Sequence, residues 1–527
     1  MPKVLVSDKL ASDGIEILKQ VAEVDVKTGL SEDELCSIIG EYDALAIRSG
    51  TKVTAKVLES AKNLKIIGRA GVGVDNVDVP VATEKGVIVV NSPGGNTLAA
   101  AELTVAMLLS LTRNIPQAHM SMCNKQWERS KFVGNEVFKK TIGILGLGKI
   151  GQEVAKRCTA FGMKVLAYDP FISSEIAEKM RVELVDFIDC IKNSDFITLH
   201  LPKNKDTVNL ITHKQFEMMK DGVKIINCAR GGIIDEDALV AAIKSGKCSG
   251  AAIDVYPTEP PDFSSEIFTL ENVITTPHLG ASTEEAQINV AIDIAEQIVD
   301  VFKGLAPRSA VNMPALAPEV LAAVQPYLPL AERMSSLAVQ LIEGRPCKIE
   351  IKYAGEISNI ECGPISRAVL VGLLKPALGE TVNPVNAPVL AESRGIEVVE
   401  SKTAEKGDFA SLLSVNIKTD KGDNEISGTL FGTREMRVVS MGGYKMDISP
   451  EGVMLVAPHL NKPGIIGRVG TLLGGENVNI SHMYVGLKPE STEKAIMILS
   501  VDSVVPENVM EQISQIDGIE NVKQVKL

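Results

Sequence analysis

The chain of 527 residues has few aromatic side chains, which make up 4% of the sequence and include a single tryptophan. Hydrophobic residues nevertheless account for 45% of the chain, so most of its interior must be aliphatic. This composition is typical of helices layered on β-sheets and disfavours a β-sandwich with an aromatic core. The length exceeds what one hydrophobic core usually supports, and we expect about three or four domains.

The eight cysteines lack the spacing of a disulfide framework or a zinc site. They are scattered along the chain and no two form a C-x-x-C pair, as expected of free thiols in a reducing compartment. No apolar run approaches the roughly 20 residues of a membrane span, and the N-terminus enters a strand pattern without a signal peptide. We therefore expect a soluble, cytoplasmic protein, with no metal site and no membrane as a partner.

An excess of positive charge is also missing. The formal net charge is −13 at pH 7, and a chain of that charge is repelled by phosphate backbones and anionic lipids. This balance argues against nucleic acid or an anionic membrane as the main partner. It leaves room for a local basic pocket.

The clearest motif lies within residues 140–169, where Gly146, Gly148 and Gly151 have the spacing G-x-G-x-x-G. An apolar run typical of a buried strand precedes them, a helix pattern includes them, and a second apolar run follows. The first glycine would form a turn, the second would let the backbone approach a pyrophosphate, and the third would let the helix pack on the strand. Three glycines at this spacing also occur by chance, so the surrounding strands and helix carry the prediction of dinucleotide binding.

Asp169 stands at the end of the second strand of this unit. A carboxylate there can accept hydrogen bonds from both ribose hydroxyls of NAD, and it would repel the extra phosphate of NADP. The motif therefore predicts NAD as the cofactor.

Residues 1–95 alternate strand-like and helix-like stretches, which predicts a parallel sheet with helices on both faces. Arg48 and Arg69 each end an apolar run, at the edge of the sheet where the ligands of such folds bind. Either arginine alone could be an ordinary exposed side chain, whereas two at matching strand ends could form an anion pocket. The residues leave both interpretations open.

Residues 96–125 have the pattern of one long helix that is apolar on nearly all sides in its first part, and we expect it to be buried between domains. Trp127, Glu128 and Arg129 follow this helix. They could lie on the surface or in an interface, so at least a dimer is expected.

Three polar clusters beyond residue 169 follow apolar runs and contain Arg230, Glu259 and His278. Loops at one edge of a sheet converge, so these side chains can meet although they are distant in sequence. Oxidation of a 2-hydroxy acid needs a base for the hydroxyl proton, a cation for the carboxylate and a group that holds the base. His278 suits the first role, Arg230 the second and Glu259 the third. Plainer interpretations are a structural histidine, a ligand of cofactor phosphate and a loop carboxylate.

The chain beyond His278 returns towards its beginning. Ser282, with a glutamate three residues later, predicts a capping box that starts a long helix. This helix would lead back to the first domain. We therefore expect a substrate-binding domain made of residues 1–95 and 283–313, which encloses a nucleotide-binding domain of residues 96–282.

The rest of the chain predicts two further α/β domains. Residues 314–452 alternate helix and strand patterns without a constellation of chemical groups. Residues 453–527 follow the order β-α-β-β-α-β, which is the ferredoxin-like motif.

Five stretches, GRAGVGVDNVD, GLGKIG with YDP, NCARGG, AAIDVYPTEPP and PHLGAST, resemble motifs of the D-2-hydroxyacid dehydrogenase family. The resemblance covers residues 1–313 and implies a Rossmann-type doubly wound nucleotide domain and a flavodoxin-like substrate domain. The tail is similar to that of the long members, which add an α/β intervening domain and a ferredoxin-like ACT domain.

The long members oxidise 3-phospho-D-glycerate to 3-phosphohydroxypyruvate with NAD, in the first step of L-serine biosynthesis. The resemblance implies the same activity here, in a homodimer or homotetramer. A glyoxylate or hydroxypyruvate reductase and an NAD-sensing, corepressor-like binding protein are alternatives that share the catalytic trio. The tail argues against both, because such reductases usually lack it and the corepressors end in a disordered tail.

The resemblance also implies which residues form the site, with Arg230, Glu259 and His278 as the catalytic trio. Position 72 is valine where some members have a threonine that touches the cofactor, so this side-chain hydrogen bond is absent. The implied cofactor-binding residues are Gly146, Gly148, Lys149, Ile150, Gly151, Asp169, Leu201, Cys228, Ala229, Arg230, Asp254, His278, Leu279, Gly280 and Ala281. The implied substrate-binding residues are Arg48, Ser49, Arg69 and Asn96, together with Arg129 of a neighbouring subunit.

The ACT domain of such enzymes resembles a serine sensor. His459, Asn461 and Asn479 are the implied effector-binding residues, and many members have an aspartate where Asn461 stands. Feedback inhibition by L-serine and a role in assembly alone are both left open.

Overall fold

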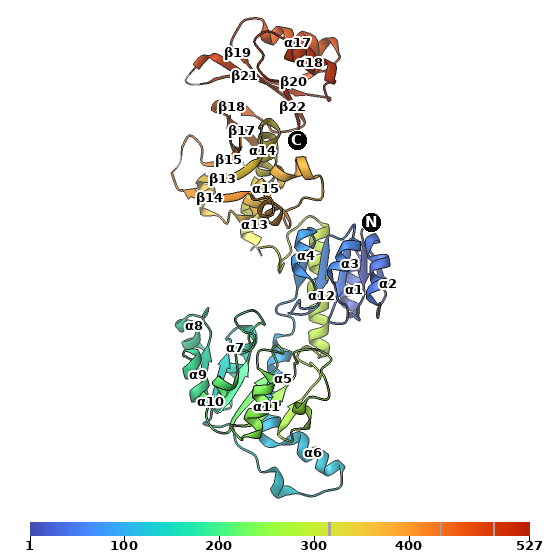
Figure 1. Ribbon diagram of the computed structural model, residues 1–527, viewed down its shortest axis with the longest axis vertical. Coiled ribbons are helices and arrows are strands. Elements are labelled where there is room, and N and C mark those ends of the chain that lie inside the picture. The colour runs from blue at the N-terminus through green and yellow to red at the C-terminus, as the bar shows by residue number, and fades with distance from the viewer. Residues whose placement is uncertain (315–317, 406, 433, 489–490) are drawn as a thin grey trace.

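The computed structural model describes residues 1–314, 318–405, 407–432, 434–488 and 491–527. These residues form an elongated molecule with four β-sheets, arranged along the long axis in Figure 1. The α/β fold class expected from the sequence is confirmed.

The first sheet is parallel throughout and has the strand order β2-β1-β3-β4-β5. This is the flavodoxin-like order, as expected. Short, fully buried aliphatic runs form its central strands, which is typical of parallel sheets covered on both faces. Its elements are β1 (Lys3–Val6), α1 (Ser12–Lys19), β2 (Glu23–Val26), α2 (Glu32–Ile38), β3 (Ala44–Ile47), α3 (Ala55–Ser60), β4 (Ile66–Arg69), α4 (Val79–Glu84) and β5 (Ile88–Asn91).

Helix α12 (Glu284–Phe302) packs on this sheet, although two hundred residues separate them in sequence. Ile294 and Ile298 are fully buried in the same core cluster as Val4 and Val6 of β1. The predicted capping residue was wrong by one position. Thr283 accepts the hydrogen bond from the backbone N–H of Ala286, because the backbone N–H of Ser282 belongs to the preceding turn and donates to Leu279.

The second sheet is also parallel and has the order β12-β11-β10-β9-β6-β7-β8. The six strands β6 to β11, in the spatial order β8-β7-β6-β9-β10-β11, reproduce the Rossmann order 3-2-1-4-5-6, and β12 adds one strand at the edge. Its strands are β6 (Thr141–Leu145), β7 (Lys164–Tyr168), β8 (Glu183–Leu184), β9 (Phe196–Leu199), β10 (Val223–Asn227), β11 (Cys248–Ile253) and β12 (Val273–Thr275). Its helices are α7 (Lys149–Ala160), α8 (Ser174–Lys179), α9 (Phe187–Asn193), α10 (His213–Met218) and α11 (Glu236–Lys244).

The single helix predicted for residues 96–125 is two helices. Helices α5 (Thr97–Arg113) and α6 (Ile115–Cys123) meet at Asn114, whose φ is 51°. Asparagine tolerates this left-handed conformation, and the proline that follows favours a new helix start. Helix α5 is buried along one side, whereas α6 projects from the molecule (Figure 1). No single helix of the described residues is long and apolar enough to span a membrane; α5 and α6 would meet the test jointly, by length and composition, but are bent by 64°.

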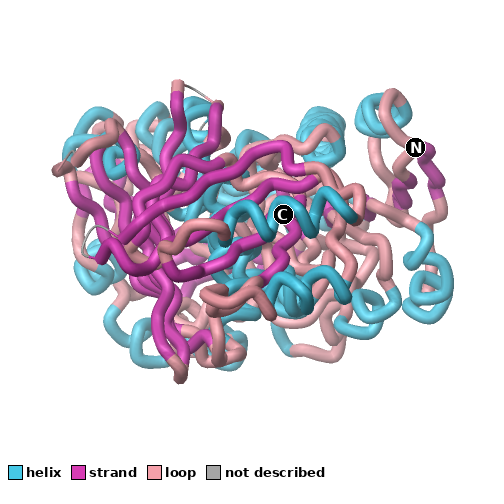
Figure 2. Tube along the Cα trace, turned by 90° about the horizontal axis from the view of Figure 1, so that it is seen from above, coloured by secondary structure: helices cyan, strands magenta, loops and turns pink. Residues whose placement is uncertain are grey.

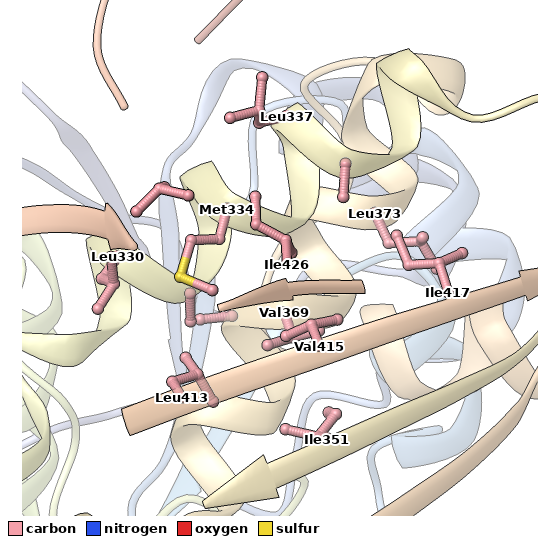
Figure 3. Close-up of a cluster of buried hydrophobic side chains, with 14 of the residues drawn as sticks. Leu330, Met334, Leu337, Ile351, Val369, Leu373, Leu413, Val415, Ile417 and Ile426 are labelled. Carbon is pink, nitrogen blue, oxygen red and sulfur yellow. The ribbon is translucent and has the colours of Figure 1, made fainter. Parts of the chain in front are cut away.

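The third sheet is mixed, with the order β14-β13-β15-β16-β17-β18. Helices α14 and α15 lie on it, and the aliphatic side chains between them form the core shown in Figure 3. Its strands are β13 (Pro346–Gly355), β14 (Glu397–Thr403), β15 (Ser411–Thr419), β16 (Gly422–Phe431), β17 (Glu435–Met441) and β18 (Tyr444–Ile448). Its helices are α13 (Pro318–Val324), α14 (Tyr327–Leu341), α15 (Gly363–Leu378) and α16 (Ala387–Glu392).

The fourth sheet has the order β20-β21-β19-β22 and is antiparallel, which confirms the ferredoxin-like prediction. Its two helices pack on one face of the sheet, at the end of the long axis in Figure 1 from which Figure 2 is viewed. The other face packs against the third unit, because Met454, Val456 and Ile496 belong to the same core cluster as Leu330 and Met334 of α14. The elements are β19 (Val453–Leu460), α17 (Ile465–Gly475), β20 (Ile480–Lys488), β21 (Ser491–Val501), α18 (Glu507–Ser514) and β22 (Lys523–Lys526).

A polar clamp joins the third unit to the first. The side-chain amide of Asn383 donates to the carbonyl oxygen of Gly86 at 2.9 Å, and that of Asn386 donates to Glu84 at 3.5 Å. Gly86 has a φ of 74°, and a Cβ atom there would overlap the Asn383 amide. The clamp therefore grips the C-terminal end of α4, while the N-terminal end of α4 lies beside the cleft described next.

Candidate active site

The glycine turn between β6 and α7 has the geometry expected of a dinucleotide site. Gly146 has a φ of 96°, and a Cβ atom there would lie 2.6 Å from the carbonyl oxygen of His200. A Cβ atom on Gly151 would overlap the carbonyl oxygen of Gly146. Gly148 differs, because no atom lies within 4 Å of its Cβ position. Gly146 and Gly151 are therefore required for the packing of the protein backbone. Gly148 instead leaves an open space before the first turn of α7, where a pyrophosphate can approach.

Asp169 lies at the end of β7 and supports this turn. Its two carboxylate oxygens accept hydrogen bonds from the backbone N–H groups of Leu147 at 2.7 Å and Phe171 at 2.8 Å. Each oxygen has a further lone pair, so ribose hydroxyls can still donate to it. Lys149 and Ile150 open α7, and Leu201 approaches Gly146 from the end of β9. Their contacts with cofactor stay predictions.

The turn after β10 is shaped by Asn227, a residue that the sequence argument missed. Its side chain donates to the carbonyl oxygen of Arg230 and accepts from the N–H of Ala229, both at 3.0 Å. Beside it, burial raises the pKa of the Cys228 thiol to about 12, so this thiol stays neutral and is no nucleophile. The signal in the sequence was an asparagine at the end of an apolar run, because a side-chain amide can both donate and accept hydrogen bonds within a turn.

His278 and Glu259 are in direct contact, with 2.6 Å between Nδ1 and Oε2. The other oxygen of Glu259 accepts from the N–H of Tyr256 at 3.1 Å. Burial tends to raise the pKa of Glu259, but the hydrogen bonds from His278 and Tyr256 together lower it below its usual value. Glu259 is thus ionised at neutral pH and holds the His278 ring with Nε2 left for a substrate.

Asp254 fixes the turn that carries His278. Its buried carboxylate accepts from the N–H groups of Leu279 at 2.7 Å and Gly280 at 3.0 Å, and from the hydroxyl of Thr276 at 2.6 Å. Burial raises the pKa of Asp254 despite these hydrogen bonds. His278 itself has a φ of 53°, a left-handed conformation that a side chain seldom adopts without such support. The described contacts of Asp254 are structural, and its predicted contact with the cofactor stays a prediction.

A cleft of about 630 Å³ separates the first lobe, built on the β1–β5 sheet, from the second lobe, built on the β6–β12 sheet. The predicted site residues that line it come from both lobes. Lys52, Asn76 and Lys203 also line it and were not predicted, since a lone lysine or asparagine at a strand end gives little signal. The predicted residues in its lining are Ser49, Arg69, Arg230, Glu259 and His278.

Arg69 is a largely buried cation of this cleft. Burial, followed by repulsion from Arg230 and Arg48, lowers its pKa to about 10, so it stays charged at neutral pH. Its Nε atom has no hydrogen-bond partner among the described residues. The guanidinium lies over Gly71, where a Cβ atom would overlap Nη1. Such a cation can accept an anion at short range.

Three predicted substrate residues lie outside the lining of the cleft. The backbone of Arg48 is anchored by Asp8, which accepts from its N–H at 2.6 Å. Asn96 precedes α5, and its buried Oδ1 has no partner within the described chain. Arg129 is exposed on the segment beyond α6. Its action across a subunit boundary stays a prediction.

The predicted effector residues differ in accessibility. His459 is 3% exposed, and its ring hydrogen-bonds the carbonyl oxygen of Ala457 at 3.1 Å. Asn479 is exposed, and its backbone N–H donates to Asp502 at 3.1 Å. The backbone N–H of Asn461 donates to Glu493 at 2.8 Å. Asn461 follows the last residue of β19, Leu460, whereas Asn479 precedes β20 at the opposite end of the sheet, where Ile480 pairs with Val501. The two asparagines therefore do not meet within one chain.

Three family descriptions match successive parts of the chain. Residues 105–280 match the NAD binding domain of D-isomer specific 2-hydroxyacid dehydrogenases. Residues 323–442 match the D-3-phosphoglycerate dehydrogenase intervening domain, and residues 459–518 match the ACT domain. The second lobe is therefore an NAD-binding domain, which confirms the predicted cofactor.

Similar proteins extend over the whole chain. D-3-phosphoglycerate dehydrogenase of Synechocystis is 49% identical over all of this chain and 95% of its own length. The enzymes of the same name from Archaeoglobus fulgidus and Bacillus subtilis are 46% and 41% identical, over all of both chains. The chain belongs to the D-3-phosphoglycerate dehydrogenase family. The family resemblance seen in the sequence is thereby confirmed.

Solved structures of relatives cover the two N-terminal lobes of this family member. D-lactate dehydrogenase from Aquifex aeolicus, solved with NAD and lactic acid, has a TM-score of 0.54 and 27% identity. It covers 59% of this chain and all of its own. A glyoxylate reductase from Paecilomyces thermophila has a TM-score of 0.55 and 26% identity, over 59% of this chain and 98% of its own. The fold of the two lobes is thus shared with dehydrogenases of several 2-hydroxy acids, so specificity must come from side chains.

The open space at Gly148 gives a direct test of the cofactor site. Gly148→Ala should leave the thermal unfolding midpoint unchanged, because the new methyl group meets no protein atom. It should weaken NADH binding at least about tenfold, because the methyl group occupies the approach of the pyrophosphate. Fluorescence titration with NADH measures the second effect. Gly151→Ala is the control, since it should lower stability as well, and unchanged NADH affinity in Gly148→Ala would contradict the assignment.

The contact between His278 and Glu259 predicts a pH dependence of stability. Folding lowers the pKa of Glu259 from its usual 4.5, so the ionised group stabilises the fold above that pH and the contribution is lost as the pH falls. Glu259→Gln should therefore lower the unfolding midpoint at pH 7 and have little effect at an acidic pH below the lowered pKa of this glutamate. Calorimetry at both pH values checks this. An equal loss at both would mean that the glutamine disturbs packing instead of charge.

Proposed function

We propose that this chain oxidises 3-phospho-D-glycerate to 3-phosphohydroxypyruvate with NAD, in the first step of L-serine biosynthesis. The observation that supports it is one cleft that combines the His278–Glu259 pair with the guanidinium groups of Arg69 and Arg230. The names of the full-length relatives agree with this substrate.

The proposed chemistry uses the cleft residues in three roles. His278 accepts the proton of the substrate hydroxyl, and Glu259 keeps its ring oriented and stabilises the imidazolium that results. Arg230 binds the carboxylate beside the reacting carbon. NAD, when bound, supplies the hydride acceptor. Gly148 and Asp169 are the residues that we propose to hold its pyrophosphate and ribose.

Selection of a phosphorylated acid is assigned to Arg69. Its guanidinium is mostly buried, has an unpartnered Nε and lies under the repulsion of two neighbouring arginines. A phosphate dianion would relieve that repulsion and fill the free donor. Arg48, Ser49 and Asn96 complete this site in the proposal, with Arg129 supplied by a neighbouring subunit of a homodimer or homotetramer.

The domain division proposed here follows the lobes. A substrate-binding domain of residues 1–95 and 283–313 encloses the NAD-binding domain of residues 96–282. Residues 314–452 then form the intervening domain and residues 453–527 the ACT domain. The packing of α12 on the first sheet supports the return of the chain. A cytoplasmic location fits the eight cysteines, which are all free thiols.

Arg69→Ala tests the substrate. The variant should raise KM for 3-phosphoglycerate about 10- to 100-fold, because a charge-assisted hydrogen bond contributes roughly 1.5–3 kcal/mol. Its affinity for NADH should stay within about twofold. Steady-state NADH production with 3-phosphoglycerate and with glycerate checks this. Equal turnover of the two acids by the unmodified protein would contradict the proposal and favour a glyoxylate or hydroxypyruvate reductase.

His278→Ala serves as the control for the catalytic half of the site. It should lower kcat by about 10² to 10⁴ with a much smaller effect on NADH affinity, because it removes the proton acceptor and leaves the glycine turn intact. No turnover of any 2-hydroxy acid by the unmodified, NADH-binding protein would favour the corepressor-like alternative.

We propose further that L-serine inhibits the enzyme by binding to the ACT domain, where His459 lies near the end of β19, Asn461 directly follows this strand and Asn479 directly precedes β20. An amide offers both a donor and an acceptor, which suits the two charges of an amino acid. Serine titrated into the assay should lower activity, and Asn479→Ala should raise the half-inhibitory concentration at least about tenfold with KM unchanged. Activity that does not respond to serine would leave the ACT domain a role in assembly alone.

A further inference from the structure

The guanidinium of Arg230 is held on three sides. Its Nη1 donates to the carbonyl oxygen of Ala229 at 2.7 Å. Its Nη2 lies over Gly73, where a Cβ atom would overlap it. Its Nε lies 3.3 Å from a carboxylate oxygen of Asp75. The first contact comes from its own turn, whereas the other two come from the loop after β4 on the opposite lobe.

Asp75 differs from the other carboxylates that line the cleft. Glu259 is engaged by His278 and Tyr256, and Asp78 accepts from the N–H of Val81 at the start of α4. Asp75 contacts an arginine of the site itself, and its side chain is 67% exposed. An ion pair so exposed is weak and easily exchanged for a better partner.

The charges around Asp75 explain why a carboxylate is tolerated in a site for acids. Arg69, Arg230 and Arg48 repel one another, which helps to lower the pKa of Arg69, and the charge of Asp75 acts in the opposite direction. Asp75 therefore offsets a repulsion that the cleft would otherwise contain. Its own carboxylate is chemically the same group as the carboxylate of a 2-hydroxy acid.

We propose that Asp75 is a built-in competitor of the substrate: its carboxylate and the substrate carboxylate bind the same guanidinium, that of Arg230. This inference rests on the proposed function in one respect, namely that Arg230 receives the substrate carboxylate. Competition lowers the affinity for every acid that binds through its carboxylate. An acid with a second anionic group offsets this loss by binding Arg69 as well, whereas an acid without such a group binds only weakly.

The test replaces the charge and measures binding without turnover. Oxamate is the carboxylate probe and inorganic phosphate is the phosphate probe, each titrated by calorimetry into the NADH complex of the full-length protein. Asp75→Asn should tighten oxamate binding about threefold, as expected on loss of a weak exposed pair, and change phosphate binding less than about 1.5-fold. KM for 3-phosphoglycerate should fall by about the same factor as the oxamate Kd.

Two control variants separate competition from a general change of field. Asp78→Asn removes the same charge from the same cleft and keeps a good helix-capping side chain. It should shift oxamate and phosphate alike, by less than about 1.5-fold. Asp75→Glu keeps the charge and should behave like the unmodified protein. Asp75→Ser also removes the charge and should give the same result as Asp75→Asn. Agreement between the two variants would show that the result does not come from a folding defect in one of them.

Weaker oxamate binding in Asp75→Asn would show that Asp75 positions Arg230, and it would overturn the proposal. Equal tightening of oxamate and phosphate would overturn it too, because the effect would then be a general one. Neither readout depends on which acid is oxidised. Failure of the substrate assignment in the Arg69 experiment is therefore distinct from failure of this inference.

Discussion

The site depends on one constraint, namely that a parallel strand releases its loop at a single edge of the sheet. Both N-terminal sheets are parallel throughout, and their carboxyl edges face one cleft. Arg69 is the last residue of β4, and Arg230 follows β10. Each lobe therefore contributes one guanidinium to the cleft simply through the position of a strand end. His278 reaches the same cleft only because Asp254, at the end of β11, holds its turn in a left-handed conformation. The topology thus brings the chemical groups to one cleft, and the carboxylates of Asp254 and Glu259 fix the position of His278.

Charge balance is the second theme of the cleft. Positive groups outnumber the carboxylates in its lining, and two of the carboxylates each restrain one cation or one imidazole. Glu259 orients His278, and Asp75 engages Arg230. The glycines of the β4 loop let the guanidinium groups lie directly against backbone, which brings the cations close enough to repel one another. A site of this kind is complementary to an acid with two separated anionic groups.

Much of this arrangement follows from sequence patterns, and the exceptions have physical causes. The glycine turn, the two parallel sheets and the ferredoxin-like order were predictable, since each has a strong local signature. The contact between His278 and Glu259 followed from convergence of strand-end loops. The break at Asn114 was missed because apolar periodicity continues across it, and backbone handedness leaves no trace in periodicity. Asn227 and Asp75 were missed because their importance lies in which atoms they face, and a pattern of residue types does not contain that information.

The shared core of the last two units has a mechanical consequence. Met454 and Val456 are packed with Leu330 and Met334, so the third and fourth sheets behave as one stiff arm. This arm meets the catalytic part at the clamp of Asn383 and Asn386 on the end of α4. The arm is therefore connected to the catalytic part through the end of a helix only six residues long. The N-terminal end of the same helix, α4, follows directly after the loop that contains Asp75.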